Sequence, residues 1–407
     1  MSEAEGIPPA CVDVLIAGCG PAGAELARLL AATGTSVLLV DPLTDLHRSA
    51  FSSAALPLAA VEQFGLPASV VASQWSRWLL LGPGLQRREW SSSQQQALGA
   101  VLDFGSLRRW LADQAVAAGA QLQLGWRAER TEPVAQGIRT QLRSVAGERR
   151  WVQSQWLIDA TGQQRALMGD PAPAHGPLVL GVGVEWLLQV DAEQWQPWAD
   201  RLSFLMGSTW VPQGYGWVFP MQPGVLKLGV CRLVDADRPQ PALKPLLDGL
   251  LQRLGLSQTQ VLDRHGGLIR SSIRRREPHQ RGRLLGLGDA VSTANLLGGE
   301  GIRHAMASSR VLAPLLLEAL EGRALALRHY PGALRRELGW RWTLSGRLAR
   351  RTWLGLQDVR ADHRLEQLLT GLHSQASAED LSALLFHYRF ERYGLRVLPY
   401  LLGWRWG

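Results

Sequence analysis

Three glycines near the start of the chain have the spacing of a loop that binds a dinucleotide. Gly18, Gly20 and Gly23 follow the buried-strand pattern of residues 12–17 and open a helix expected at residues 24–32. In such a loop the first glycine allows the tight turn, the second lets the backbone approach a pyrophosphate, and the third lets the helix pack closely on the sheet. The free N–H groups and the dipole at the helix N-terminus favour the negative charge of the pyrophosphate. The pattern predicts cofactor contacts at Gly18, Gly20, Pro21, Ala22 and Gly23.

An acidic residue ends the second strand expected in the same βαβ unit. Residues 36–40 form a short apolar run, and Asp41 follows it. A carboxylate at this position accepts hydrogen bonds from ribose hydroxyls and repels a 2′-phosphate. The two signals together favour FAD or NAD over NADP, and an incidental glycine turn in an α/β protein is the alternative.

Two later segments distinguish between these two dinucleotides. Residues 158–162 (IDATG) end a predicted buried strand, and residues 288–290 (GDA) precede a helix expected at 302–321. A nicotinamide dehydrogenase needs neither element. Asp289 could bind the ribityl chain of a flavin, while the N-terminus of the following helix would stabilise negative charge on a reduced isoalloxazine. The combination favours FAD.

Three aromatic side chains occupy alternate positions of one predicted strand. Tyr215, Trp217 and Phe219 are therefore expected to project from the same face. Such an aromatic wall offers area and shape to a long apolar substrate without polar demands. An ordinary sheet core is the alternative, because aromatic residues are favoured in strands.

Other ionisable residues carry weaker signals. His304 near the start of the helix and Glu300 in the loop before it could act as acids beside a flavin, but structural roles explain both residues as well. His265 precedes two glycines and is expected in a loop. We find no nucleophile–histidine–acid set and no metal-ligand cluster, and three widely spaced cysteines predict neither a disulfide framework nor a zinc site.

The elements that must position these residues predict an α/β fold. Short apolar runs indicate buried parallel strands, residues 126–158 alternate as in an antiparallel meander, and residues 42–100 suggest loops and short helices. We expect a Rossmann-like FAD-binding domain with an inserted, mostly antiparallel β-sheet substrate domain and a helical C-terminal segment. The expected boundaries are residues 1–170 and 280–330 for the FAD-binding domain, 171–279 for the substrate domain and 331–407 for the C-terminal segment.

Composition restricts the partners and the location. The 407-residue chain has a net charge of +8, but only Lys227 and Lys244 are lysines among its 43 basic residues. This bias, and the lack of any known nucleic-acid-binding motif, argue against a nucleic-acid partner. We see no signal peptide and no apolar run of about 18 residues, so we expect a cytoplasmic protein. Arginines and tryptophans in residues 335–351 could add a peripheral membrane contact, or could form an ordinary solvated helix face.

The chain resembles the flavin enzymes of the p-hydroxybenzoate hydroxylase fold and, among them, the geranylgeranyl reductase family. The family signature Pro-x-x-Tyr-x-Trp-x-Phe-Pro is matched at every named position by residues 212–220 (PQGYGWVFP). The family's flavin loop reads approximately GDAAGxxxPxxGEGI, and its spacing is followed by residues 288–302 (GDAVSTANLLGGEGI). The resemblance covers most of residues 12–322.

Two features depart from the family pattern. The proline of the flavin loop falls on Leu296, and the Ala-Gly pair falls on residues 291–292 (Val-Ser), so the backbone beside the isoalloxazine is expected to differ. Many relatives also carry an arginine ahead of the helix that follows the first βαβ unit. Here its role could pass to Arg48, Arg108 or Arg109.

The resemblance implies an FAD-dependent oxidoreductase that reduces carbon–carbon double bonds of a hydrophobic isoprenoid or lipid substrate. NADPH or reduced ferredoxin would supply the electrons. The alternatives are a lycopene cyclase-like carotenoid enzyme, a hydroxylase that uses NADPH and oxygen, and a flavin-binding protein without turnover. No catalytic residue and no metal ligand is assigned. Beyond the glycine loop and Asp41, the implied cofactor contacts are Arg48, Gly288, Asp289, Gly299, Gly301 and Ile302, and the implied substrate contacts are Tyr215, Trp217 and Phe219.

Overall fold

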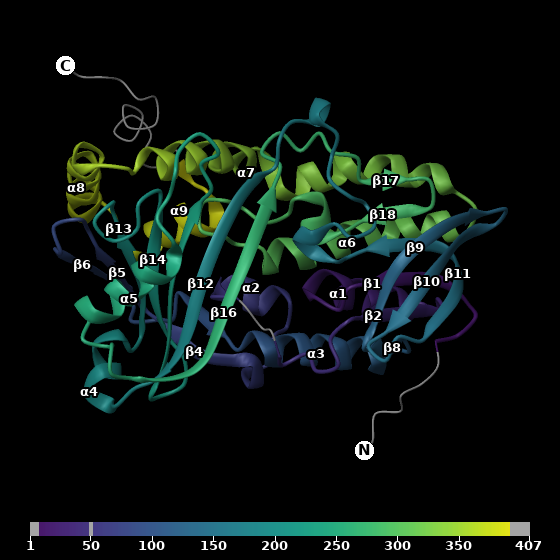
Figure 1. Cartoon of the computed structure of the whole chain (residues 1–407), viewed down its shortest axis with the longest axis horizontal. Helices are drawn as coiled ribbons and strands as arrows, with labels where there is room; N and C mark the ends of the chain where they lie inside the picture. Colours follow the sequence, from purple (N-terminus) through teal and green to yellow (C-terminus); the bar gives the residue numbers. More distant parts are fainter. Residues whose placement is uncertain (1–7, 49–51, 391–407) are drawn as a thin grey trace.

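Short apolar runs of the sequence form a parallel sheet at one end of the molecule (Figure 1). The computed structural model describes residues 8–48 and 52–390. The sheet order is β17-β18-β11-β1-β2-β8, and all neighbours are parallel except β17 and β18. Its strands are β1 (Cys11–Ala17), β2 (Val37–Asp41), β8 (Gln121–Leu124), β11 (Arg149–Asp159), β17 (Gln280–Arg281) and β18 (Leu284–Gly286).

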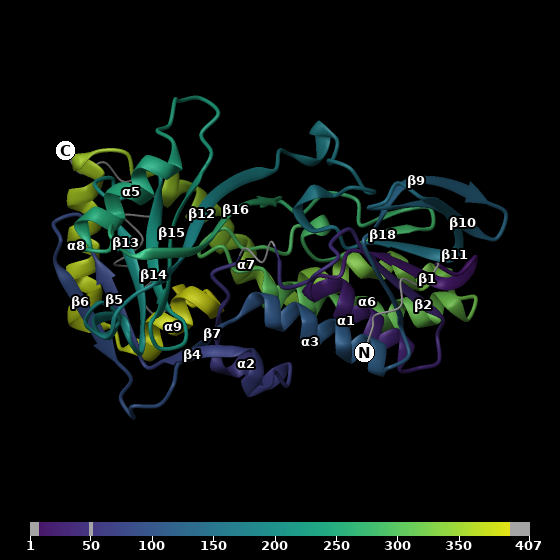
Figure 2. The same ribbon diagram turned by 60° about the horizontal axis from the view of Figure 1, so that its bottom comes forward.

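Helices cover one face of this first sheet, and a meander covers the other. On the helical face α1 (Pro21–Ala31) packs against both α3 (Phe104–Ala117) and α6 (Ile302–Leu320), as Figures 1 and 2 show. On the opposite face, β9 (Trp126–Val134) and β10 (Gly137–Ser144) continue antiparallel from β11. This confirms the antiparallel meander that the alternating pattern predicts.

A second, seven-stranded sheet lies at the other end of the molecule. Its neighbours are antiparallel except for β13 and β5, which are parallel. Helix α5 (Leu243–Arg253) covers one face through a leucine-rich core, with the short α4 (Ala192–Trp195) nearby. In order, the strands are β16 (Gln260–Ser271), β12 (Val179–Gln189), β15 (Val225–Leu233), β14 (Gly214–Pro220), β13 (Arg201–Met206), β5 (Arg77–Leu81) and β6 (Arg87–Ser91).

Residues 42–100 are richer in strands than their sequence suggests. They supply β5 and β6 to the second sheet, although they lie within the 1–170 range expected for the first domain. They also form a three-stranded sheet, β3-β7-β4, beside α2 (Leu58–Gln63). The expected short helices occur, as α2 and η1 (Ala68–Val70), but the strands were missed, because they find their partners through tertiary pairing that local propensity does not reveal. The three strands are β3 (Ala55–Pro57), β4 (Val71–Trp75) and β7 (Gly99–Leu102).

The described C-terminal part, up to residue 390, is helical, as expected, and joins the two ends of the molecule; residues 391–407 of the expected helical segment lie outside the described residues. Helix α7 (Tyr330–Gly355) runs along the top of Figure 1 past both sheets, with a break at Gly339. Helices α8 (Val359–Gln375) and α9 (Ala378–His387) pack on the aromatic face of the second sheet. Among the described helices, none combines the length and the apolar character that a bilayer span requires. Short 3₁₀ helices are η1 (Ala68–Val70), η2 (Gly162–Gln164), η3 (Pro173–His175), η4 (Gln196–Trp198), η5 (Gly288–Val291) and η6 (Ala324–His329).

Candidate functional site

The glycine loop between β1 and α1 has the geometry that a pyrophosphate needs. Gly18 has a φ of +110°, and a Cβ there would lie 2.3 Å from the carbonyl oxygen of Ala160. A Cβ on Gly23 would lie 1.9 Å from the carbonyl oxygen of Gly18, so the turn and the helix can approach only without side chains. A Cβ on Gly20, by contrast, would meet no atom within 4 Å. The loop is therefore closed against the protein and open above Gly20.

The first turn of α1 leaves its N–H groups available to an anion. Gly20 is the N-cap and offers no side-chain hydrogen bond, and the first turn contains no acidic residue. Free N–H groups and the helix dipole then present positive potential to the open space above Gly20. The loop and the helix end together fit a cofactor diphosphate.

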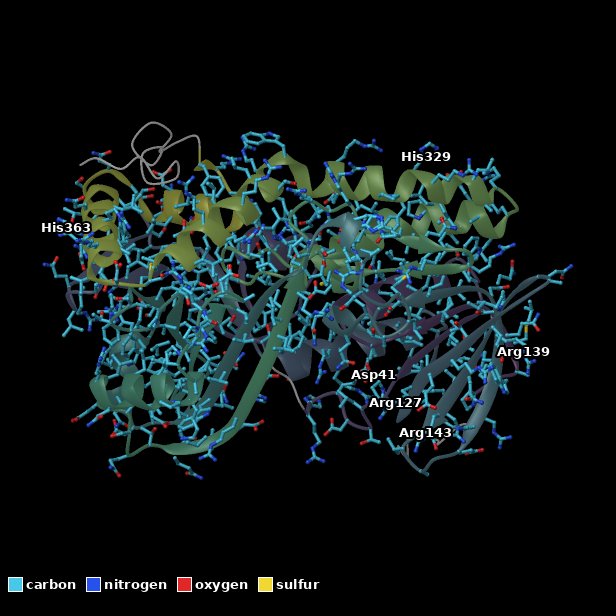
Figure 3. The ribbon with its side chains drawn as sticks, turned by 45° about the horizontal axis from the view of Figure 1, so that its top comes forward. Asp41, Arg127, Arg139, Arg143, His329 and His363 are labelled. Atoms are coloured by element: carbon cyan, nitrogen blue, oxygen red, sulfur yellow. The ribbon has the colours of Figure 1, made fainter. Side chains whose placement is uncertain are left out.

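Asp41 shapes the loop from the end of β2. One carboxylate oxygen accepts a 2.8 Å hydrogen bond from the backbone N–H of Cys19, and the other accepts a 2.9 Å bond from the N–H of Leu43. In Figure 3 Asp41 lies on the same side of the molecule as Arg127 and Arg143 of the meander. Each oxygen keeps a lone pair that a ribose hydroxyl could use.

The three arginines considered from the sequence differ in their surroundings. Arg108 is buried in α3 and donates to the backbone carbonyls of Leu46 and Arg48. The side chain of Arg48 is exposed, while Arg109 forms an ion pair with Asp113. Arg108 thus holds the segment that follows Asp41.

The IDATG segment builds a turn that packs on the glycine loop. Asp159 accepts hydrogen bonds from the N–H and hydroxyl of Thr161, and also from the backbone N–H groups of Leu167 and Met168. The turn brings Ala160 against Gly18 and carries Arg165 inward. Asp159 is therefore an organising residue of the backbone.

The loop of residues 288–302 lies directly beside the glycine loop. A Cβ on Gly288 would lie 2.8 Å from the Cβ of Ala22, and Ser309 of α6 donates a 2.7 Å hydrogen bond to the Ala22 carbonyl. Asp289 is half-buried; burial raises the pKa of its carboxyl group, and a hydrogen bond from Thr293 acts in the opposite direction. The two segments are thus close enough for one dinucleotide to reach both.

A cavity of about 270 Å³ lies between the 288–302 loop and the second sheet. Helix α6 begins at its edge, again without a side-chain cap. The expected cofactor residues that do not line it are Gly18, Gly20, Ala22, Gly23, Asp41, Arg48 and Gly288. The residues singled out from the sequence that do line it are Pro21, Tyr215, Trp217, Phe219, Asp289, Gly299, Glu300, Gly301 and Ile302.

The aromatic wall forms as the alternating pattern predicts. Ring centroids are 6.1 Å apart for Tyr215 and Trp217 and 6.4 Å apart for Trp217 and Phe219. Phe204 of β13 extends the wall, with its centroid 5.4 Å from that of Phe219. Gly229 of β15 makes room for it, since a Cβ there would lie 2.2 Å from the ring of Trp217.

A buried polar pair lies behind this wall. The indole N–H of Trp217 donates a 3.0 Å hydrogen bond to Glu185 of β12. Burial raises the pKa of Glu185, while nearby Lys227 and the Trp217 bond act in the opposite direction. Lys227 donates to the carbonyls of Ser52 and Leu102. The Trp217 ring is therefore fixed by a directional contact in addition to packing.

Part of the remaining wall of the cavity comes from the C-terminal helices and was not found from the sequence. The ring centroid of Trp353 in α7 lies 4.9 Å from that of Tyr215, and the indole N–H of Trp353 donates a 3.1 Å hydrogen bond to the Leu297 carbonyl. Leu385 and Phe386 of α9 also line the cavity. Their helical, apolar spacing indicates only a buried face, so no local signal could have assigned them to a site.

Glu300 is the centre of a buried network that ties α9 to the 288–302 loop. Arg303 donates to both of its carboxylate oxygens, at 2.7 and 2.9 Å, and the hydroxyl of Tyr388 donates at 2.8 Å. His304 lies 2.9 Å from the same hydroxyl. Burial opposes ionisation of Glu300, but Arg303 and His304 outweigh it and hold the pKa of Glu300 well below its usual range. Glu300 is thus a carboxylate at neutral pH and holds structure there.

A second buried polar cluster lies behind residues 290–292. Arg165 donates to the carbonyl of Ala290 and to the hydroxyl of Ser292, and Arg275 donates to the carbonyl of Ser292. Glu277 and His279 are buried nearby, and neither side chain has a hydrogen-bond partner within the described part of the chain. Burial, followed by the charges of nearby arginines, lowers the pKa of His279 to about 3.

This shift predicts a pH dependence of stability that His279→Leu removes. Between about pH 6.5 and pH 3 the unfolded chain binds a proton at this histidine that the folded chain does not, so stability falls as the pH falls through this range. At about pH 5 the wild type should have lost about 2 kcal/mol relative to pH 7.5 through this group. Urea denaturation at both values should show a smaller pH effect in His279→Leu. An identical pH effect in both proteins contradicts the expectation.

No group of three or more metal-ligating side chains occurs within residues 8–48 and 52–390. His265 was expected in a loop but lies in β16, opposite Glu185 of β12.

The candidate site is formed by the N-termini of α1 and α6, the glycine loop and the aromatic wall.

Residues 11–331 match the family model described as FAD binding domain. A digeranylgeranylglycerophospholipid reductase of Haloferax volcanii is 27% identical to the chain over 328 residues, which are 76% of each protein. A menaquinone reductase of Mycobacterium tuberculosis is 27% identical over 364 residues, 83% of each protein. The crystal structure of a geranylgeranyl bacteriochlorophyll reductase-like protein from Thermoplasma acidophilum superposes with a TM-score of 0.79 at 21% identity, over 94% of this chain and 98% of that one. This structural likeness confirms the predicted fold class.

Proposed function

The chain belongs to the FAD binding domain family and is an FAD-dependent oxidoreductase, and we propose that it saturates carbon–carbon double bonds of an isoprenoid lipid. The observation that carries this proposal is the shared cavity. The aromatic wall of Tyr215, Trp217 and Phe219 faces the same space as the 288–302 loop and the N-terminus of α6. A long apolar chain could lie along the wall while one double bond reaches the cofactor.

The residues described above supply a consistent set of cofactor contacts. The loop at Gly18–Gly23 and the N-terminus of α1 would hold the diphosphate, and Asp41 the ribose. Asp289 and the N-terminus of α6 would lie beside the ribityl chain and the isoalloxazine. When bound and reduced, FAD supplies hydride to a carbon of the double bond.

The side chains around the cavity would bind the substrate and exclude water. Aromatic and aliphatic groups dominate its lining, including Trp353 and Phe386 from the C-terminal helices. Both relatives named above are reductases, and the substrates in their names carry isoprenoid chains. An apolar cavity that accepts such a chain beside a flavin supports the same substrate class here.

The proposal predicts a single-turnover reaction that needs no natural electron donor. The FAD-loaded protein is reduced with dithionite without oxygen and mixed with a lipid that carries geranylgeranyl chains. We expect the absorbance of oxidised flavin to return at a rate that depends on lipid concentration, and the product to gain two hydrogen atoms per flavin. The matched control is the fully saturated lipid, which should leave the flavin reduced.

Other results would identify the alternatives. Rearranged lipid without flavin oxidation would indicate a cyclase-like reaction, and rapid oxygen consumption with NADPH would indicate a hydroxylase. If no isoprenoid lipid oxidises the flavin, the proposed reaction is wrong. If one does, NADPH and reduced ferredoxin can be compared as electron donors for steady-state turnover.

A further inference from the structure

The two buried arginines behind the 288–302 loop have no role in the function proposed so far. We propose that Arg165 and Arg275 form a cationic brace that fixes Ser292 and makes the site bind reduced FAD more tightly than oxidised FAD. The inference rests on the proposed function, because it requires the isoalloxazine to lie at this loop. Arg165 and Arg275 are positioning residues here, since they act through the loop.

The contacts of the brace converge on a strained residue. Ser292 has a φ of +61°, in the left-handed region that glycine adopts far more easily than serine. The hydroxyl of Ser292 accepts a 2.7 Å hydrogen bond from Arg165 and a 2.8 Å bond from the backbone N–H of Ser272. Arg275 donates a 2.5 Å bond to the Ser292 carbonyl. Ser292 occupies the position of a glycine in the flavin loop of the geranylgeranyl reductase family. The brace therefore stabilises a left-handed conformation that glycine would adopt without such support.

The brace also places positive charge close to the cavity. Both guanidinium groups are buried, with 2% of Arg165 and 4% of Arg275 exposed. Arg165 is close enough to interact electrostatically with Asp289, which lines the cavity. Glu277 and Asp289 oppose these two charges, while Arg270 and Arg335 add positive charge around the pair. In a buried environment such charge acts over a longer range than in water.

Two features show how this charge reaches the loop. The electrostatic potential at His279 is positive, because the charges of Arg275, Arg335 and Arg165 act together with burial to lower the pKa of this histidine. The arginines also bond the carbonyls of Ala290 and Ser292, which polarises these peptides and strengthens the following N–H groups as donors. Reduction adds negative charge to the isoalloxazine, so positive charge behind the loop favours the reduced form.

The test is the midpoint potential of bound FAD, measured by anaerobic titration with a redox dye. In Arg165→Met and in Arg275→Met we expect the preference for reduced FAD to fall about tenfold, which lowers the potential by about 30 mV for a two-electron couple. Arg165→Lys keeps the positive charge, so its midpoint potential should stay near that of the wild type. If Arg165→Met fails to fold, the comparison of Arg275→Met with Arg165→Lys still tests the effect of the charge. The matched control is Arg283→Met, which removes an exposed arginine that stacks on Trp156.

Ser292→Gly separates the charge from the conformational role. Glycine removes the strain, so Arg165→Met in this background should bind FAD as well as Ser292→Gly does and still show the lower potential. A potential difference that disappears in the Ser292→Gly background, or potentials that never change, overturn the electrostatic role while FAD binding stands. Failure of the wild type to take up FAD would overturn both the brace and the proposed cofactor site.

Discussion

Gly20→Val is expected to leave the apoprotein folded and to weaken FAD binding by at least about a hundredfold. The backbone of Gly20 is extended, with φ −84° and ψ −176°, which valine adopts without strain. Its Cβ would point into open space, so the fold has nothing to rearrange. The same space is where a diphosphate would approach the N-terminus of α1, and a hundredfold loss corresponds to about 2.7 kcal/mol.

Titration of the apoprotein with FAD, followed by flavin fluorescence, measures this loss. The matched control is Gly249→Val in α5, where a Cβ also meets no atom within 4 Å. That helix covers the far face of the second sheet, so FAD affinity should not change. Thermal melting of the apoprotein should differ little between Gly20→Val and the wild type. Undiminished FAD binding in Gly20→Val would show that the diphosphate lies elsewhere.

The parts of the fold that the sequence predicts depend on local backbone constraints. Gly18 and Gly23 are required by contacts with Ala160 and with the loop itself, and the strand–glycine–helix order expresses this within a few residues. The wall of Tyr215, Trp217 and Phe219 is similarly local, because a strand alternates its side chains. Helices α1 and α6 begin and end within three residues of the expected bounds.

The parts that could not be predicted depend on long-range packing. Strand β5 pairs in parallel with β13, which follows more than a hundred residues later, and the sequence of β5 does not indicate which strand it pairs with. His265 precedes two glycines that are typical of loops, yet pairing with β12 keeps this segment in a strand. Gly267, the second of those glycines, lines the cavity. The lack of a side chain, which suggested a loop, thus leaves room in the cavity.

The same argument applies to the C-terminal helices. Trp353 and Phe386 belong to the cavity only because α7 and α9 fold back over the aromatic face. The position of Phe386 depends on the network of Glu300, because Arg303 donates to the Phe386 carbonyl. Two members of this network, Glu300 and His304, were considered from the sequence without their partner Tyr388. A partner 88 residues away leaves no sequence pattern.

Glu300→Gln is therefore expected to lower the free energy of unfolding by about 3–5 kcal/mol. The carboxylate is buried and accepts two hydrogen bonds from Arg303 and one from Tyr388. Glutamine has nearly the same shape but leaves the half-buried guanidinium of Arg303 without its counter-charge. Arg303 also donates a 2.7 Å bond to the Phe386 carbonyl, so the change should loosen the cavity wall as well. Urea denaturation near pH 7.5 measures the effect.

Glu318→Gln is the matched control, since Glu318 pairs with Arg323 at 3.5 Å on the surface and both side chains are exposed. Such a pair contributes at most about 1 kcal/mol. The pH dependence gives a second measurement. Because the pKa of Glu300 is held below its usual range, its contribution is complete above about pH 4.3, the unfolded value, and is lost as the pH falls further. The difference in free energy of unfolding between the wild type and Glu300→Gln should therefore become smaller in acid. If Glu300→Gln and Glu318→Gln lower the free energy of unfolding equally at neutral pH, this network does not hold α9 against the loop.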